Sequence, residues 1–121
     1  MRHRKRGKIL DRAQSSRKAL LRQMIVSFIL HGRMQTTLAK AKVVQQAVEP
    51  LVTMARRNTL AVRRTLLKLC GTSSDAQQAV RLLLEKFGPK YAQRKGGYTR
   101  LVKGKVRLGD GAQRVFLEFI E

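Results

Sequence analysis

The chain has 121 residues, of which 27 are Lys or Arg and 7 are Asp or Glu, giving a formal net charge of +20. This length suits one domain, and an apolar share of 43% is enough for a core, so the composition excludes a wholly disordered basic tail. So large a positive charge on a small body indicates a polyanionic partner, with nucleic acid the first candidate and an anionic membrane surface the second.

Residues 1–15 form a basic extension. Apart from Ile9 and Leu10 nothing in it can pack, so we expect it to be extended or disordered on its own. Basic arms of this type become ordered by lying along phosphates. Its predicted contacts are Arg2, His3, Arg4, Lys5, Arg6, Lys8 and Arg12. The remaining residues, 16–121, are predicted to form a single α+β RNA-binding domain.

Four helices are predicted where apolar residues recur at spacings of three and four. They are expected over residues 17–31, 38–55, 60–70 and 74–87. Residues able to cap these helices stand at their starts: Ser15 or Ser16, Thr37, Asn58 or Thr59, and Ser74. Gly88-Pro89 is predicted to stop the fourth helix. A kink or break is expected near Pro50, because proline removes a backbone donor and clashes with the preceding turn.

Three strands are predicted, a brief one over residues 33–37 and two at the C-terminus. The C-terminal pair, residues 98–108 and 113–120, is joined by a turn signal at Gly109-Asp110-Gly111. Residues 113–120 are apolar on both faces, which favours a central or covered position. The predicted fold is therefore α+β, a small mixed sheet with the helices packed on one side.

The segment from Lys86 to Arg107 is strongly basic and contains no acid. At its middle, Arg94–Arg100 combines two adjacent glycines, an aromatic ring and several cations, a set of groups that suits structured RNA with exposed bases. The alternative is a solvated loop that leads into a strand. For Tyr98 we favour contact with a base or sugar, whereas Tyr91 is predicted either to lie in the core or to face RNA.

The same residues argue against catalysis, a metal site or a membrane span. The acids are scattered, and the histidines, His3 and His31, have no clustered partners. Cys70 is the single cysteine, which excludes a disulfide within the chain and fits a reducing compartment. No apolar run is long enough to cross a bilayer. We expect a soluble, cytoplasmic protein without cofactors that is not an enzyme.

Several ordered blocks along the whole chain resemble the L-seventeen family of bacterial large-subunit ribosomal proteins. These blocks are Met1-Arg2-His3 with Gly7, Leu10 and Arg12; Arg17-x-Ala19-Leu20-x-Arg22; Thr36-Thr37-x-x-Lys40-Ala41-Lys42; Glu49-Pro50-Leu51; Pro89-Lys90-Tyr91-Ala92; Gly96-Gly97-Tyr98-Thr99-Arg100; and Gly109-Asp110. The resemblance implies a structural component of the large ribosomal subunit near the exit-tunnel side. Its partners would be large-subunit ribosomal RNA and neighbouring ribosomal proteins.

The resemblance also implies which residues contact RNA beyond the extension. The full predicted set there is Ser16, Arg17, Arg22, Thr36, Thr37, Lys40, Lys42, Arg94, Lys95, Gly96, Gly97, Tyr98, Arg100 and Lys103. Asp11 stands where the family commonly has asparagine, and phosphate would repel its carboxylate, so it is not included.

Two alternatives from other classes remain at this point. The helices on either side of Cys70-Gly71 resemble a helix-turn-helix, which would make the chain a DNA-binding protein. Residues 75–87, however, carry few side chains suited to reading base edges. The second alternative is a peripheral membrane protein, which a basic amphipathic helix would favour.

Overall fold

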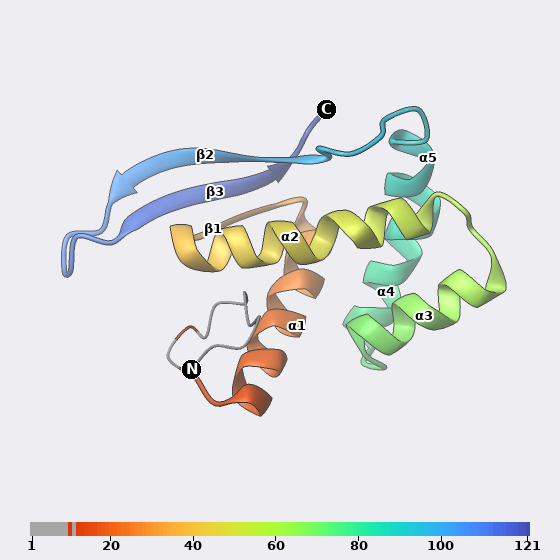
Figure 1. The fold of residues 1–121 in the computed structure, drawn as a ribbon, viewed down its shortest axis with the longest axis horizontal. Helices are drawn as coiled ribbons and strands as arrows, with labels where there is room; N and C mark the ends of the chain where they lie inside the picture. Colours follow the sequence, from red (N-terminus) through yellow and green to blue (C-terminus); the bar gives the residue numbers. More distant parts are fainter. Residues whose placement is uncertain (1–9, 11) are drawn as a thin grey trace, which may run out of the picture.

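The computed structural model describes Leu10 and residues 12–121 (Figure 1). In chain order its elements are α1 (Gln14–His31), β1 (Arg33–Thr37), α2 (Leu38–Ala55), α3 (Leu60–Cys70), α4 (Ser74–Leu82), the π-helical segment η1 (Leu83–Phe87), α5 (Gly88–Lys90), β2 (Thr99–Val106) and β3 (Gln113–Phe119). The helices lie on one side of the sheet, which confirms the predicted α+β class (Figure 1).

The sheet has three strands in the order β1-β3-β2, and β3 is antiparallel to both neighbours. The central position predicted for residues 113–120 is confirmed, but the prediction of a mixed sheet was wrong. β1 starts beside the end of β3, where Arg33 pairs with Glu118, and runs back to pair Thr37 with Arg114. It therefore has the same direction as β2, and no parallel pair arises.

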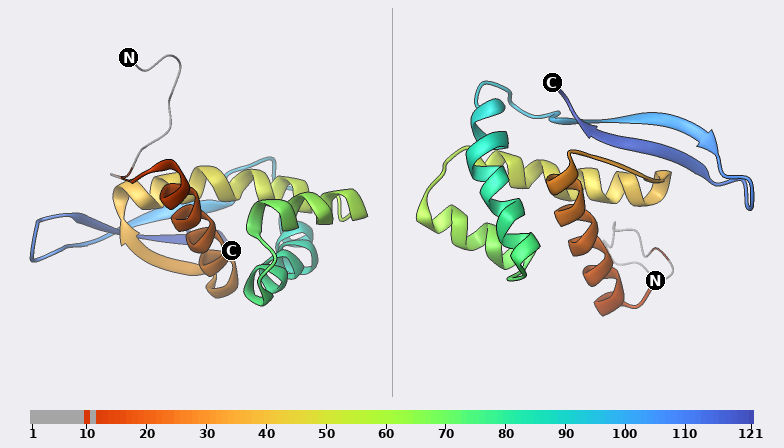
Figure 2. Two further views of the ribbon diagram at one scale, coloured as in Figure 1. Left: turned by 90° about the horizontal axis from the view of Figure 1, so that it is seen from below. Right: turned by 180° about the vertical axis from the view of Figure 1, so that it is seen from behind.

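The hairpin of β2 and β3 extends past the helices (Figure 2). At its turn, the N–H of Arg107 donates to the carbonyl of Ala112, and the N–H of Gly111 donates to the carbonyl of Arg107. The pairing register shifts between Lys103 and Val106, which places a β-bulge in β2. The predicted turn is thus confirmed, with β2 ending at Val106.

The core lies between the helices and the inner face of the sheet. Phe119 at the end of β3 stacks on Phe28 of α1, with ring centroids 4.5 Å apart, and on Phe87 of η1 at 4.1 Å. The apolar stripes predicted for the helices supply most of the other buried side chains. Those that are fully buried in these stripes include Ile29, Val44, Val48, Val80 and Leu83.

The N-cap predicted for α3 is confirmed, whereas the N-cap of α4 lies one residue before the predicted one. Thr59 caps α3, its hydroxyl accepting a hydrogen bond from the N–H of Val62 at 3.2 Å. The cap of α4 is Ser73, whose hydroxyl accepts from the N–H of Ala76 at 3.1 Å. The predicted cap, Ser74, is instead the first residue of the helix.

Neither α1 nor α2 has a side-chain cap. The residue before α1 is Ala13, so the cap predicted at Ser15-Ser16 was wrong, because the helix already includes both serines. Thr37 does precede α2, as predicted, but its side chain makes no capping hydrogen bond. The first N–H groups of α2 are therefore left without that partner.

Neither proline region breaks its helix. Pro50 lies inside α2, which continues without interruption to Ala55, so the helix tolerates the missing donor without a break. The predicted stop at Gly88-Pro89 was wrong. Gly88 has helical dihedrals, φ −57° and ψ −55°, and the helical run continues through α5 to Lys90. Pro89 fits there as an early residue of α5.

Gly88 is needed for close packing instead. A Cβ on Gly88 would lie 2.6 Å from the carbonyl oxygen of Ala55, at the end of α2. Because this neighbour is backbone, it cannot rotate away as a side chain would. The glycine thus allows the α4–α5 run to approach α2 at contact distance.

We predict that Gly88→Ala destabilises the protein by about 1 to 3 kcal/mol, the usual cost of overpacking. Helix propensity alone favours alanine over glycine by about 1 kcal/mol, so the sign of the change separates the two effects. Urea unfolding followed by circular dichroism measures it. Gly109→Ala is the control, since a Cβ there meets nothing within 4 Å. A stability of Gly88→Ala equal to or above that of the parent chain would contradict the packing role.

Candidate nucleic-acid interface

The loop between α5 and β2 is built around Gly96 and Gly97. Both have positive φ, 145° and 62°, and a Cβ at either position would meet no neighbouring atom. The guanidinium of Arg94 reaches across the turn and donates from Nη1 to the carbonyl of Gly97 at 3.1 Å. The glycines therefore serve the shape of the turn, and Lys95 beside them is exposed.

Tyr98 does not present its ring to a ligand. Tyr98 is only 1% exposed, which contradicts the predicted contact with a base or sugar. Its hydroxyl lies 3.0 Å from Oγ1 of Thr53, accepts from Nη1 of Arg56 at 3.4 Å and donates to the carbonyl of Arg94 at 3.3 Å. The tyrosine instead connects the loop to α2 and to the residue that follows it.

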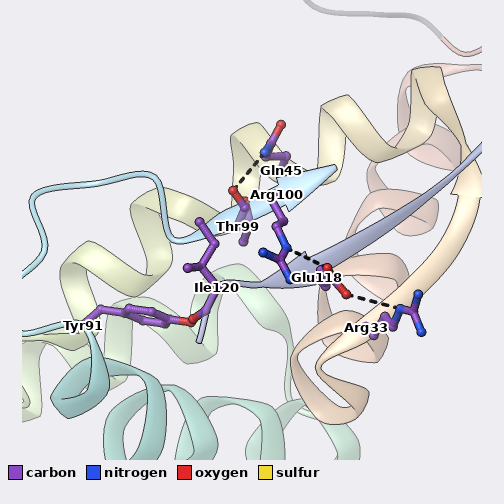
Figure 3. Close-up of polar contacts among 7 residues, drawn as sticks. All are labelled: Arg33, Gln45, Tyr91, Thr99, Arg100, Glu118 and Ile120. Carbon is purple, nitrogen blue, oxygen red and sulfur yellow. Dashed lines mark hydrogen bonds and ion pairs between the residues drawn. The ribbon is translucent and has the colours of Figure 1, made fainter. Parts of the chain in front are cut away.

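Tyr91 belongs to the core, which decides between its two predicted positions. It is 4% exposed, its ring lies 5.2 Å from that of Tyr98, and its hydroxyl donates to the carbonyl of Ile120 (Figure 3). Burial, the largest cause, raises the pKa of its phenol. Both tyrosines thus pack beneath the loop.

Three residues that sequence reasoning missed connect this region to α2 and to the residue that follows it. Arg56 donates from Nη2 to the carbonyl of Ala92 at 2.6 Å. The carboxylate of Glu49 accepts from both the N–H and the hydroxyl of Thr99, at 3.2 and 2.7 Å. The amide of Gln45 also donates to the carbonyl of Thr99 at 3.5 Å (Figure 3). Nothing in the local sequence around Glu49 or Arg56 signals these contacts, because their partners are distant in the chain.

A second cationic region lies at the start of α2. It is a hollow of about 300 Å³ lined by Gln35, Thr36, Thr37, Lys40, Arg107 and Arg114. The predicted residues Thr36, Thr37 and Lys40 are thus brought together, and Arg114 joins them because β3 pairs it with Thr37. The first turn of α2 has no acid. Uncapped N–H groups and cations together favour an anion such as a phosphate.

Arg107 contributes less positive charge to this hollow than its position suggests. It donates from Nε and Nη2 to the two carboxylate oxygens of Asp110, at 2.8 and 2.5 Å. The hydrogen bond from Arg107, with a further one from the N–H of Ala112, holds the pKa of Asp110 well below its usual range. The pair closes the hairpin turn and leaves Lys40 and Arg114 as the main cations of the hollow.

The other predicted contacts differ in their surroundings. Those that are exposed are Arg12, Ser16, Arg22, Lys42, Arg94, Lys95, Gly97, Arg100 and Lys103, and those that are half-buried are Arg17, Thr36, Thr37, Lys40 and Gly96. Arg100 is partly neutralised, because its Nε donates to Glu118 at 2.7 Å. The predicted contacts Arg2, His3, Arg4, Lys5, Arg6 and Lys8, and the excluded Asp11, lie outside the described residues.

The part of the chain that the structure describes offers little support for a metal site, a membrane-spanning helix or a nucleophilic cysteine. No group of three or more His, Cys, Asp or Glu side chains there has the arrangement of a metal site. Within the same residues, no helix combines the length and apolar character needed to span a bilayer. Burial raises the pKa of the Cys70 thiol, which disfavours the thiolate that a nucleophile needs.

We predict that Tyr98→Phe destabilises the protein by about 0.5 to 1.5 kcal/mol, because the hydroxyl loses part-buried hydrogen bonds to the Arg94 carbonyl and the Arg56 guanidinium. Amide hydrogen exchange at Gly96, Gly97 and Thr99 should accelerate. Thr65→Ala is the control, since the Thr65 hydroxyl bonds only within its own helix. Exchange rates in this loop equal to those of the parent chain would show that the hydroxyl does not hold it.

Comparison with known families adds one finding. A family model described as Ribosomal protein L17 matches residues 20–120. The match includes the loop between α5 and β2, the hollow at the start of α2 and all three strands.

Proposed function

The chain belongs to the ribosomal protein L17 family, and from that premise we propose that it binds large-subunit ribosomal RNA and stabilises the RNA fold. The family is one of structural, non-enzymatic proteins of the large ribosomal subunit, which act in translation. What the proposal adds is the RNA contact itself, the surfaces that make it, and a position near the exit-tunnel side beside neighbouring ribosomal proteins.

The observation that carries the proposal is the placement of unneutralised cations at both ends of α2. Lys40 and Arg114 lie at the hollow at its start, and Lys95 lies in the loop held by Arg56 just past its end. Among the described residues, the ion pairs involve only Arg33, Arg100 and Arg107. The cations at both ends therefore have no carboxylate partner in that part of the chain.

The spacing of these cations fits a large folded polyanion. An 18-residue helix such as α2 is roughly 27 Å long at about 1.5 Å per residue. One phosphate cannot reach both ends, whereas a folded RNA presents phosphates over that distance. Displaced counterions would then supply much of the affinity, and RNA shape, 2′-hydroxyls and unpaired bases the specificity. The basic extension over residues 1–15 is proposed to add further phosphate contacts.

We predict that replacing Lys40, Lys95 and Arg114 together with alanine weakens binding to purified large-subunit ribosomal RNA and flattens its salt dependence. Each lost phosphate contact removes about 0.7 to 0.9 from the slope of log K against log salt, so the total change should be about 2 to 3. Filter binding over a range of salt concentrations measures it.

The matched control removes three cations elsewhere, with Arg63, Arg64 and Lys68 of α3 changed to alanine. All three are exposed and lie outside both cationic regions. Equal slopes for the two triple variants would mean that net charge alone drives binding. Duplex DNA and anionic liposomes at the same salt complete the test. Binding to either as tight as to ribosomal RNA would favour the corresponding alternative function.

A further inference from the structure

The outer face of the sheet, which no helix of the described chain covers, carries a fixed arrangement of charged and aromatic side chains (Figure 1). At its centre, Phe116 and Glu118 of β3 lie on one face. The register places Arg33 of β1 and Arg100 of β2 on either side of Glu118. These four residues come from all three strands, so the folded sheet alone brings them together.

Glu118 holds the two arginines in place. Its Oε2 lies 3.4 Å from Nε of Arg33, and its Oε1 accepts from Nε of Arg100 at 2.7 Å (Figure 3). The carboxylate is shielded, with its side chain 19% exposed, while the two arginine side chains are 57% and 58% exposed. One carboxylate between two guanidiniums leaves a net charge of +1 on these three side chains, which balances the single negative charge of one backbone phosphate.

Arg33 is also stacked. The central carbon of its guanidinium lies 4.1 Å from the centroid of the Phe116 ring. Gly104 of β2 makes room for this ring, because a Cβ there would lie 3.3 Å from Cε2 of Phe116. The guanidinium thus lies over an aromatic ring, its Nε lies beside Glu118, and more than half of the Arg33 side chain remains exposed.

We propose that the Arg33–Phe116 stack is a platform for one unpaired base of the ribosomal RNA, with Arg100 beside it to bind that nucleotide's phosphate or 2′-hydroxyl. Guanidinium planes are established surfaces for unstacked RNA bases. The arrangement fits a nucleotide better than an apolar protein surface, because two guanidiniums that are more than half exposed flank Glu118 on this face. This inference rests on the proposed function and adds a subsite to it.

The deciding variant is Arg33→Lys, which keeps the charge and removes the plane. In the full chain it should lower affinity for purified large-subunit ribosomal RNA about fivefold to tenfold, at the low end of the effect of losing one stacked base. The salt slope should stay unchanged, because no cation is lost. Arg63→Lys, an exposed arginine of α3, is the matched control and should bind as the parent chain does.

Because Arg33→Lys can also disturb the ion pair with Glu118, a second measurement uses the parent chain. Arginine modification of the parent chain with a glyoxal reagent, followed by mass spectrometry of peptides, should find Arg33 reactive in the free protein and protected in the RNA complex. Urea unfolding of Arg33→Lys checks that the sheet is intact.

The outcomes separate this inference from the proposed function. If the parent chain does not bind ribosomal RNA, the proposed function fails and the platform fails with it. If the parent chain binds but Arg33→Lys binds equally well, only the platform is overturned. Protection of Arg33 in whole large subunits but not in the RNA complex would overturn it too, and would assign this face to a protein.

Discussion

The stacking of Phe119 between Phe28 and Phe87 is the contact on which the arrangement of the rest depends. It joins the C-terminal strand to the first helix and to the π-helical segment, parts of the chain that are far apart in sequence. Since β3 is the central strand, fixing its end also fixes the positions of β1 and β2 beside it. The outer face of the sheet, which spans all three strands, is therefore positioned by one aromatic cluster.

Three carboxylates in the described part of the chain fix particular points of the fold. Of the 7 Asp and Glu residues, Glu49 anchors the start of β2, Asp110 closes the hairpin turn, and Glu118 orients two arginines. Each of these carboxylates is engaged within the fold. Among the described residues, these carboxylates form ion pairs with only Arg33, Arg100 and Arg107, so the other cations there remain available to an anionic partner.

The sequence was a good guide to the helices, to the positions of the strands along the chain and to the location of basic residues, because these depend on local periodicity and composition. Gly88-Pro89 was misread as a stop because its role depends on the approach of α2, which no local pattern records. Tyr98 was misread for a similar reason. A tyrosine beside glycines and cations looks like a ligand contact, and only the fold places Thr53 and Arg56 around its hydroxyl. Arg114 and the Arg33–Phe116 stack likewise depend on strand register.

The bulge in β2 disfavours pairing between the sheet edges of separate copies of the chain. β2 is an edge strand, and an unbroken edge offers backbone groups that can pair with the same edge of another molecule. Here the register shift between Lys103 and Val106 interrupts that row, and Lys103 and Lys105 add like charges along it. The strand is thus poorly suited to edge-to-edge aggregation during the interval between synthesis and incorporation into a particle.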